Sequence, residues 1–413
     1  MAWNLEIHHI DVGQGDSTLI IARDINFFGN VVQTQAALVD GGTYAKGVDV
    51  HDYVTNTANL NQVDVIVATH YDADHFGGLR RVLGNGTAVY DNALIFDQGE
   101  PGQISVKSSR GQTGFVQHIS NREQDYTAYL TAINSRGARN RVTANVSCAP
   151  PSTHMTALAG WRQPNWLLGE ELLWHGAVPP VGAPTITCIA ANQYVDGVVG
   201  GPFTSGMAVD PKNEKSLALL VEFNNFRYYL GGDIESTQET RIAQRINPAN
   251  NAQGRVLAMK VSHHGSDRST AATFVNRLRP SAAFISCGFD NTHHHPRPTV
   301  LQNLQNCATL QHYYLTADRN NQAFRTRVGK NGPPAVAPNL AGAYTAKAVV
   351  AGCWGGLYDA GPGVREGNII LSVTTAQSLQ PVTGAIPMGT HRFRVTCESA
   401  NCANHQNVQN DHD

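Results

Sequence analysis

The fold of this chain is decided by one stretch, Thr69-His70-Tyr71-Asp72-Ala73-Asp74-His75-Phe76-Gly77-Gly78, which follows an apolar run at 63–68 typical of a buried strand. Alternate residues of an extended segment share one face, so His70, Asp72 and Asp74 are expected to converge, with His75 opening the next element. Gly77 and Gly78 are expected to let the backbone turn tightly beneath them. Imidazole and carboxylate groups hold Zn²⁺, Mn²⁺ or iron and leave a position for water. The sequence therefore predicts a metal site here rather than a plain polar turn.

Composition places the chain among globular enzymes. Its 413 residues are 41% hydrophobic and 15% charged, with a formal net charge of −2. A large core is therefore expected, and there is no overall basic field of the kind that marks many nucleic-acid-binding proteins. A local groove can still bind a nucleotide or nucleic acid.

The cysteines and the apolar runs indicate in which cellular compartment the protein is expected. The seven cysteines are scattered, which argues against a disulfide framework and against a structural zinc knuckle. No apolar run approaches the roughly 18 residues needed to span a bilayer, and Met1 leads directly into a predicted strand. These observations predict a cytoplasmic protein without a membrane partner.

Patterning predicts alternating strands and helices over most of the chain. Strands are predicted at about 5–12, 17–23, 36–42, 63–68, 93–97, 186–190, 216–223, 226–230, 256–261 and 282–287. Helices are predicted at about 47–60, 75–83, 122–136, 235–246, 270–278 and 299–306. The periodicity fades over 98–165, which predicts an inserted lid or substrate-binding segment. One domain is thus expected over 1–400, with this insertion, followed by a polar tail over 401–413.

Several predicted strands stop at an aspartate or a histidine. This happens at His70, Asp233, His264 and His295. In layered α/β proteins the loops that follow the strands meet at one edge, where ligands bind. Each position alone would be an ordinary turn or surface residue, but together they predict one site.

At this point the sequence resembles the metallo-β-lactamase superfamily, and within it the hydrolase domain of the ComEC-type competence proteins that import DNA. The motifs that carry the resemblance stand in the family's order: 10–17, 38–42, 69–78, 213–217, 230–233, 260–266 and 291–298. The resemblance implies an α/β fold, the αββα four-layer sandwich, with metals at one edge between two sheets. It does not extend to a membrane channel.

The resemblance also implies a set of metal ligands. His70 and Asp72 would bind a first metal, Asp74 and His75 a second, and Asp233 would bridge the two. A further ligand comes from His263 or His264, and we favour His264. The implied cofactors are two divalent ions, Zn²⁺ or Mn²⁺.

Other residues in the resembling motifs are implied to contact the substrate or to transfer protons. His295 would be a metal ligand, or a proton donor and phosphate contact. Arg297 departs from the family's pattern, and it is expected either to bind phosphate in a bidentate manner or to be a surface residue. Asn213 and Ser216 lie where other branches of the family place a third histidine. They are therefore candidate substrate contacts, and the first metal position is expected to be rich in oxygen and short of imidazole.

The chemistry follows from these residue types. Two metals about 4 Å apart lower the pKa of a bound water to about 7 and polarise the bond under attack. Asp74 would accept the proton of that water, and His295 or His263 would protonate the leaving group. The leading function is a phosphodiesterase or nuclease acting on nucleic acid or a small nucleotide, supported by basic residues near the motifs: Lys212, Lys215, Arg268, Arg277, Arg279 and Arg297. The alternatives are a hydrolase of a lactam, a lactone or another C–N or C–O bond, and a binding module with a decayed site.

Overall fold

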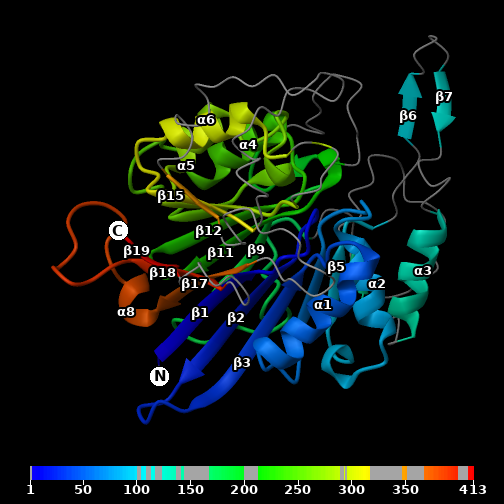
Figure 1. Ribbon diagram of the computed structural model, residues 1–413, viewed down its shortest axis with the longest axis horizontal. Coiled ribbons are helices and arrows are strands. Elements are labelled where there is room, and N and C mark those ends of the chain that lie inside the picture. The colour runs from blue at the N-terminus through cyan, green and yellow to red at the C-terminus, as the bar shows by residue number, and fades with distance from the viewer. Residues whose placement is uncertain are drawn as a thin grey trace, which may run out of the picture.

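Two β-sheets packed face to face form the centre of the computed structural model (Figure 1). The structure describes residues 2–99, 104–107, 113–116, 123–135, 141–143, 167–199, 213–288, 293, 295–316, 347–350, 367–398 and 408–413. Within these ranges, the first sheet has nine strands in the order β19-β18-β17-β1-β2-β3-β4-β5-β8, and the second has eight in the order β10-β9-β11-β12-β13-β14-β15-β16.

The strands follow the predicted positions closely. The first sheet contains β1 (Ala2–His9), β2 (Thr18–Ile25), β3 (Val31–Val39), β4 (Val65–Ala68), β5 (Leu94–Asp97), β8 (Arg141–Thr143), β17 (Asn368–Thr374), β18 (Phe393–Glu398) and β19 (Val408–His412). The second contains β9 (Thr185–Ala191), β10 (Tyr194–Val195), β11 (Ala218–Phe223), β12 (Phe226–Gly231), β13 (Ala258–Lys260), β14 (Ala282–Ile285), β15 (His312–Leu315) and β16 (Ala348–Val350). A separate hairpin joins β6 (Ile104–Lys107) to β7 (Thr113–Val116) within the predicted insertion.

Helices cover the outer face of each sheet. On the first sheet these are α1 (Gly47–Asp52), α2 (Phe76–Gly84) and α3 (Glu123–Asn134). On the second they are α4 (Ser236–Ile246), α5 (Ala272–Leu278) and α6 (Pro298–Asn306), and a short helix, α8 (Thr375–Ser378), follows β17. In the described ranges no helix is long and apolar enough to pass through a bilayer.

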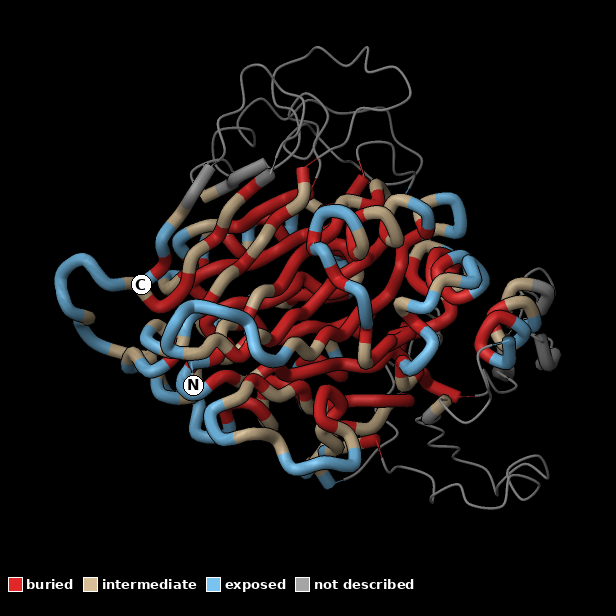
Figure 2. The backbone as a smooth tube through the Cα atoms, turned by 90° about the horizontal axis from the view of Figure 1, so that it is seen from below, coloured by how far each residue is buried: buried red, intermediate tan, exposed pale blue. Residues whose placement is uncertain are grey.

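Side-chain alternation along the strands builds three apolar layers. In β2, Ile20 and Ala22 face the core between the sheets, while Leu19 and Ile21 face the helices. The central strands are consequently buried on both faces, and exposed residues gather in the connecting loops (Figure 2). This arrangement confirms the predicted αββα four-layer sandwich.

The expected polar tail over 401–413 is wrong for its last residues. Val408–His412 forms the edge strand β19, which pairs with β18. Its final residue, His412, is fully buried, stacks on Phe393 with ring centroids 4.6 Å apart, and shares a 2.6 Å hydrogen bond with the hydroxyl of Tyr314. One buried aromatic anchor fixes a strand in which Gln409, Asn410 and Asp411 are polar, so the pattern alone did not reveal it.

Candidate metal centre

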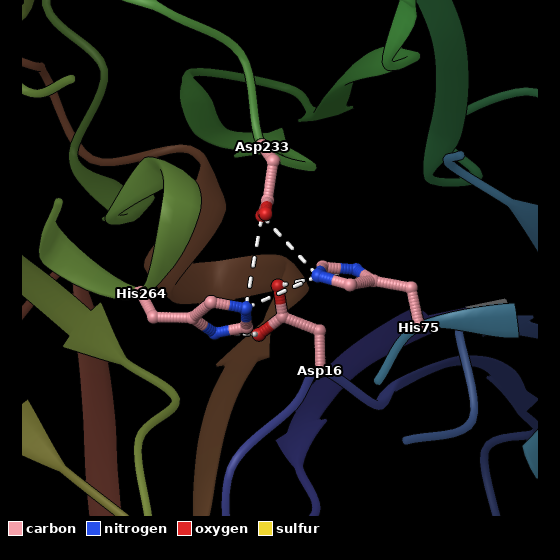
Figure 3. Close-up of side chains that lie close together, drawn as sticks. All are labelled: Asp16, His75, Asp233 and His264. Atoms are coloured by element: carbon pink, nitrogen blue, oxygen red, sulfur yellow. Dashed lines mark hydrogen bonds and ion pairs between the residues drawn. The ribbon is translucent and has the colours of Figure 1, made fainter. Parts of the chain in front are cut away.

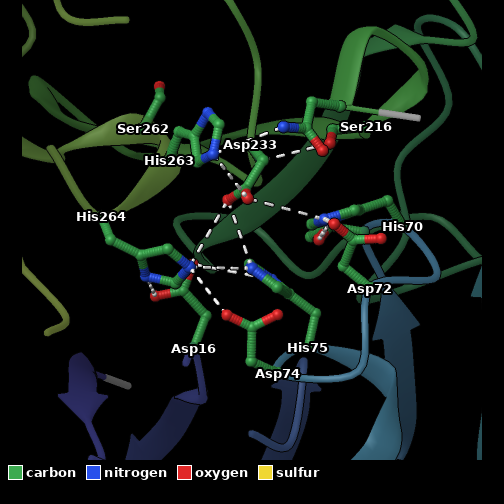
Figure 4. A network of polar contacts seen from close by, with 12 residues as sticks. Asp16, His70, Asp72, Asp74, His75, Ser216, Asp233, Ser262, His263 and His264 are labelled. Atoms are coloured by element: carbon green, nitrogen blue, oxygen red, sulfur yellow. Dashed lines mark hydrogen bonds and ion pairs between the residues drawn. The ribbon is translucent and has the colours of Figure 1, made fainter. Parts of the chain in front are cut away.

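Parallel strand pairing brings the predicted ligands to one edge of the molecule. β3 pairs with β4 in the first sheet and β12 with β13 in the second, all in parallel. Their carboxyl ends therefore open at the same edge, and the residues that follow them meet there (Figure 4). The loop at 69–75 follows β4, Asp233 follows β12, and 262–265 follows β13.

Asp233 lies at the centre of four histidines. Its Oδ1 is 3.2 Å from Nε2 of His75 and 3.7 Å from Nε2 of His264. Its Oδ2 is 3.7 Å from Nε2 of His70 and 3.5 Å from Nε2 of His263. Each carboxylate oxygen thus faces two imidazoles, the arrangement expected of an acid shared between two metal positions.

The contact between His75 and His264 fits a cation. Their Nε2 atoms are 3.1 Å apart. Nδ1 of His75 donates to Oδ2 of Asp40 at 2.8 Å, and Nδ1 of His264 donates to the carbonyl of Ser286 at 3.0 Å. Because both acceptors lack hydrogens, the neutral rings present Nε2 lone pairs to each other. Such a pair is favourable only with a proton or metal between the rings, and ligand atoms around a tetrahedral Zn²⁺ lie about 3.4 Å apart.

The first loop carries a second indication of metal binding. Nε2 of His70 is buried and has no hydrogen-bond partner, although a buried polar atom normally has one. It is 3.8 Å from Oδ2 of Asp72, too far for a hydrogen bond. A metal ligated by both atoms would satisfy this nitrogen, so the residues present fit divalent cations.

Asp40, which the sequence analysis did not select, orients two of the histidines. Besides holding His75, it accepts hydrogen bonds from the backbone and the hydroxyl of Thr69, at 2.8 and 2.7 Å. The Thr69 hydroxyl oxygen in turn lies 3.1 Å from Nδ1 of His70. One buried carboxylate therefore sets both rings with Nε2 toward Asp233, the outer-shell support that metal-binding histidines usually have.

Replacing Asp40 with asparagine is expected to weaken metal affinity about 10- to 100-fold, because two rings lose their anionic acceptor. Isothermal titration calorimetry with Zn²⁺ would measure this affinity. Thr69→Val, which removes the hydroxyl between Asp40 and His70 but leaves the Asp40 carboxylate on His75, is the matched comparison and should weaken one binding event. Unchanged affinity in Asp40→Asn would show that the orientation of the rings does not depend on this carboxylate.

Asp16 is the second acid missed by the sequence analysis. Asp16, His75, Asp233 and His264 are all buried, with ligand atoms within 4.8 Å of one another (Figure 3). Oδ2 of Asp16 also forms a 2.5 Å ion pair with the buried Lys260. Gly15 allows this placement, since a Cβ on Gly15 would lie 2.4 Å from the carbonyl oxygen of Asp74. In the sequence, Asp16 is indistinguishable from an ordinary turn aspartate.

At Gly78 two backbone segments approach each other closely, and the expected tight turn does not occur at this residue. The residue lies in α2, and a Cβ at this position would lie 1.7 Å from the carbonyl oxygen of Gly41. The missing side chain lets the first turn of α2 pack directly against the end of β3, which brings His75 beside Asp40.

Local charges shift the pKa values of the central groups in opposite directions. Burial lowers the pKa of His75, but Asp233 and Asp40 outweigh it and raise that pKa well above its ordinary value. Burial would raise the pKa of Asp233, yet His263, His75, His264 and His70 hold it well below the usual range. The two carboxylates thus favour positive charge at this position, which a divalent cation would supply.

The remaining predicted site residues lie around this centre. Oδ2 of Asp74 is 3.5 Å from Nε2 of His264. The ring of His295 lies 5.4 Å from that of His263, centroid to centroid. Arg297 is half-buried at the start of α6, and its backbone nitrogen donates to the carbonyl of Gly265 at 2.7 Å.

Two predicted substrate contacts instead face residues of the centre. Nδ2 of Asn213 lies 3.3 Å from Nε2 of His263. Ser216 is fully buried, and its hydroxyl accepts the backbone N–H of Asp233 at 3.1 Å. Its burial places Ser216 behind Asp233, out of reach of a substrate, where it fixes the position of the carboxylate.

Arg277 and Arg279, predicted to support nucleotide binding, lie away from the centre. They stand at the end of α5, where the carbonyl of Leu278 accepts the N–H of Val256 ahead of β13. The histidines of the candidate centre follow the opposite end of β13, so proximity in sequence was misleading. Lys212 lies outside the described residues, which leaves Lys215, Arg268 and Arg297 of the six predicted cations.

A buried polar cluster attaches part of the insertion to the metal loop. Arg141 of β8 forms two hydrogen bonds with Asp97, at 2.8 and 3.1 Å. It also contacts the hydroxyls of Tyr126 in α3, at 3.2 Å, and of Tyr71, at 3.4 Å. Since Tyr71 lies between His70 and Asp72, the insertion helps to hold the loop that carries the first ligands.

Comparison with known proteins agrees with this geometry. Residues 13–90, which include Asp16, Asp40 and the whole metal loop, match the family model described as the metallo-beta-lactamase superfamily. The match identifies residues 13–90 as a metallo-β-lactamase superfamily segment. The candidate metal site draws Asp16 and His75 from this segment.

Two relatives extend the comparison within the superfamily. The chain is 42% identical over 127 residues to ComE operon protein 3 of Bacillus subtilis (strain 168), covering 30% of this chain and 15% of that protein. It is 30% identical over 108 residues to Recombination protein 2 of Haemophilus influenzae, covering 26% and 12%. The resemblance to ComEC-type proteins is thus confirmed, while the chain spans less than a sixth of the length of either relative.

Solved structures of the superfamily are similar at low identity. A metal-dependent hydrolase of the beta-lactamase superfamily matches at 13% identity and a TM-score of 0.34, over 69% of this chain and 89% of that one. The Zn²⁺-bound PqqB of Methylobacterium extorquens matches at 11% identity and a TM-score of 0.30, over 62% and 71%.

Proposed function

We propose that this metallo-β-lactamase-superfamily hydrolase cleaves phosphodiester bonds in nucleic acid or a small nucleotide at a dinuclear metal centre. The observation that carries the proposal is the placement of four imidazoles around the two oxygens of Asp233. The ComEC-type relatives, one of them named as a recombination protein, support nucleic acid as the class of substrate.

Charge balance supports two divalent ions. Five carboxylates contact the four histidines: Asp16, Asp40, Asp72, Asp74 and Asp233. Lys260 is the buried cation paired with one of them. Five negative charges and one positive charge leave four negative charges, which two divalent cations neutralise. Asp16, Asp40 and Asp233 are buried, whereas Asp72 and Asp74 are partly exposed. Buried charge without compensation costs several kcal/mol per group, so the balance supports bound divalent cations.

The proposed ligands are His70 and Asp72 on one side, Asp74, His75 and His264 on the other, and Asp233 between them. When bound, the metals would supply a water of lowered pKa and polarise the phosphoryl group. The mixture of imidazole and carboxylate suits Zn²⁺ or Mn²⁺.

The chain's own residues would then move the protons. The side chain of Asp74 is 30% exposed, against 17% for Asp72 and 5% for Asp233. It is thus the carboxylate best placed to accept a proton from water. Burial and the neighbouring His264 and His263 lower the pKa of His295 to about 2, so this imidazole would donate a proton only when an anionic substrate offsets its surroundings.

Arg297 is the proposed phosphate contact. Its backbone is held at the rim by the carbonyl of Gly265, while its Nε is buried and has no hydrogen-bond partner. A phosphate oxygen would satisfy this donor, and the planar guanidinium suits bidentate binding.

Turnover of phosphodiesters would test the proposal. Purified protein loaded with Mn²⁺ or Zn²⁺ is expected to hydrolyse bis-p-nitrophenyl phosphate, plasmid DNA or cyclic dinucleotides, and to lose at least about a hundredfold of this activity in Asp74→Ala. Asp49→Ala, which removes a carboxylate from a surface ion pair with Lys46, is the control and should retain activity. Hydrolysis of nitrocefin or a lactone alone would instead establish the C–N or C–O alternative.

A further inference from the structure

Two successive residues with left-handed backbone lie beside the centre. His263 has φ 51° and ψ 44°, and His264 has φ 51° and ψ 18°. For residues other than glycine this conformation is unfavourable, and it persists where the surrounding structure requires it. The backbone N–H of His263 donates to the carbonyl of Gly232 at 3.1 Å, and that of Ser266 donates to the carbonyl of His263 at 2.8 Å, so the turn is fixed from both sides.

The left-handed turn directs adjacent rings to different oxygens. Nε2 of His263 faces Oδ2 of Asp233 at 3.5 Å, whereas Nε2 of His264 faces Oδ1 at 3.7 Å. The two rings lie 6.4 Å apart with 71° between their planes. In a strand, neighbouring side chains would point to opposite faces, and one of these rings would leave the centre.

The Oδ2 side of Asp233 already collects the residues of the first metal position. Nε2 of His70 lies 3.7 Å from Oδ2, and Asp72 lies beside His70. Asn213 lies in the motif where other branches of the family place a third histidine. Its amide Nδ2 is 3.3 Å from Nε2 of His263. Nε2 of His263 is thus directed toward Oδ2 of Asp233 and lies beside the amide of Asn213.

We propose that His263 is a ligand of the first metal, together with His70, Asp72 and Asp233. This assignment rests on the dinuclear centre of the proposed function. It gives each metal position two imidazoles and two carboxylates, with Asp233 shared, in place of the oxygen-rich first position expected from sequence. It also removes His263 from the candidates for proton donor and leaves His295 in that role.

Metal stoichiometry tests the assignment independently of catalysis. Apo protein would be loaded with Zn²⁺, desalted and measured by elemental mass spectrometry, with isothermal titration giving the affinity of each site. Wild type is expected to retain two equivalents. His263→Gly, which supports a positive φ and provides no ligand atom, is expected to retain one, with affinity for the lost ion at least about a hundredfold weaker.

Three comparisons make the result specific. His264→Gly should also retain one equivalent, and the absorption spectra of the two Co²⁺-loaded variants should differ because different positions remain filled. His263→Asn, which tolerates the same backbone conformation, shows whether the turn itself is intact. His293→Ala is the matched control, since His293 is exposed and stacks on His295 with ring centroids 5.7 Å apart; it should retain two equivalents.

Two outcomes would overturn the assignment: two equivalents with unchanged affinity in His263→Gly, or a wild type that binds one ion. A wild type that binds two ions but hydrolyses no phosphodiester would reject the proposed function and leave the role of His263 intact.

Discussion

Asp233→Asn is expected to lose both metals and at least about a thousandfold of the hydrolytic rate, because one carboxylate faces all four imidazoles. The amide keeps the size of the side chain but removes its negative charge and turns one ligand oxygen into a donor nitrogen. Each of the remaining acids lies on one side of the centre, so none of them can replace the shared carboxylate.

Elemental analysis and turnover measured on the same preparation would check this expectation. Asp196→Asn is a suitable control, since Asp196 pairs with Arg245 at 2.7 Å beside α4 and contributes nothing to the centre in the described structure. Ser216→Ala should fall between the two, because the carboxylate remains but loses the hydroxyl that holds its backbone. Retention of two metals by Asp233→Asn would mean that the positions are built without a shared acid.

Lys260→Met is expected to destabilise the metal-free protein by about 3–5 kcal/mol, the usual consequence of removing one member of a buried ion pair. Lys260 and Asp16 are 1% and 2% exposed, and the ammonium also contacts the carbonyl of Gly231 at 3.2 Å. The methionine would fill the volume but leave Asp16 as an uncompensated buried anion among other carboxylates. Lys260, with His264 and His75, outweighs the effect of burial and holds the pKa of Asp16 below its ordinary value.

Urea denaturation in the presence of a chelator would measure the loss. The double variant Asp16→Asn/Lys260→Met provides the decisive comparison, since removing both charges should restore much of the free energy of unfolding. A Lys260→Met protein as stable as wild type would show that Asp16 becomes protonated or hydrated at little cost.

Most of the fold and the core of the centre could be predicted from sequence for physical reasons. Apolar runs ending at His70, Asp233 and His264 mark the carboxyl ends of parallel strands, and such ends meet at one edge. Neighbouring residues in one loop also have to be neighbours in space, which made the density of ligands at 69–75 informative.

Other features depend on backbone geometry that residue types do not reveal. Asp40 follows a strand and Asp16 precedes one, as aspartates in ordinary turns do. Only the folded chain shows that both face imidazole rings. The left-handed turn at His263 and His264 is held by the hydrogen bond from the backbone N–H of His263 to the carbonyl of Gly232, a contact between distant segments that the sequence does not reveal. The strand β13 is only three residues long, so residues at its two opposite ends are close in sequence although they lie at opposite ends of the sheet. Arg279 was predicted to lie near the centre for this reason.

The centre takes its residues from both halves of the sandwich. Asp16, Asp40, His70 and His75 come from loops of the first sheet, whereas Asp233, Lys260 and His264 come from the second. Metal ions held between them would crosslink two layers that also meet at this edge through polar contacts such as the Asp16–Lys260 ion pair. A chelator would therefore stop the proposed chemistry and also leave mutually repelling acids at the seam, so that the metal-free protein should unfold at a lower urea concentration than the metal-loaded protein.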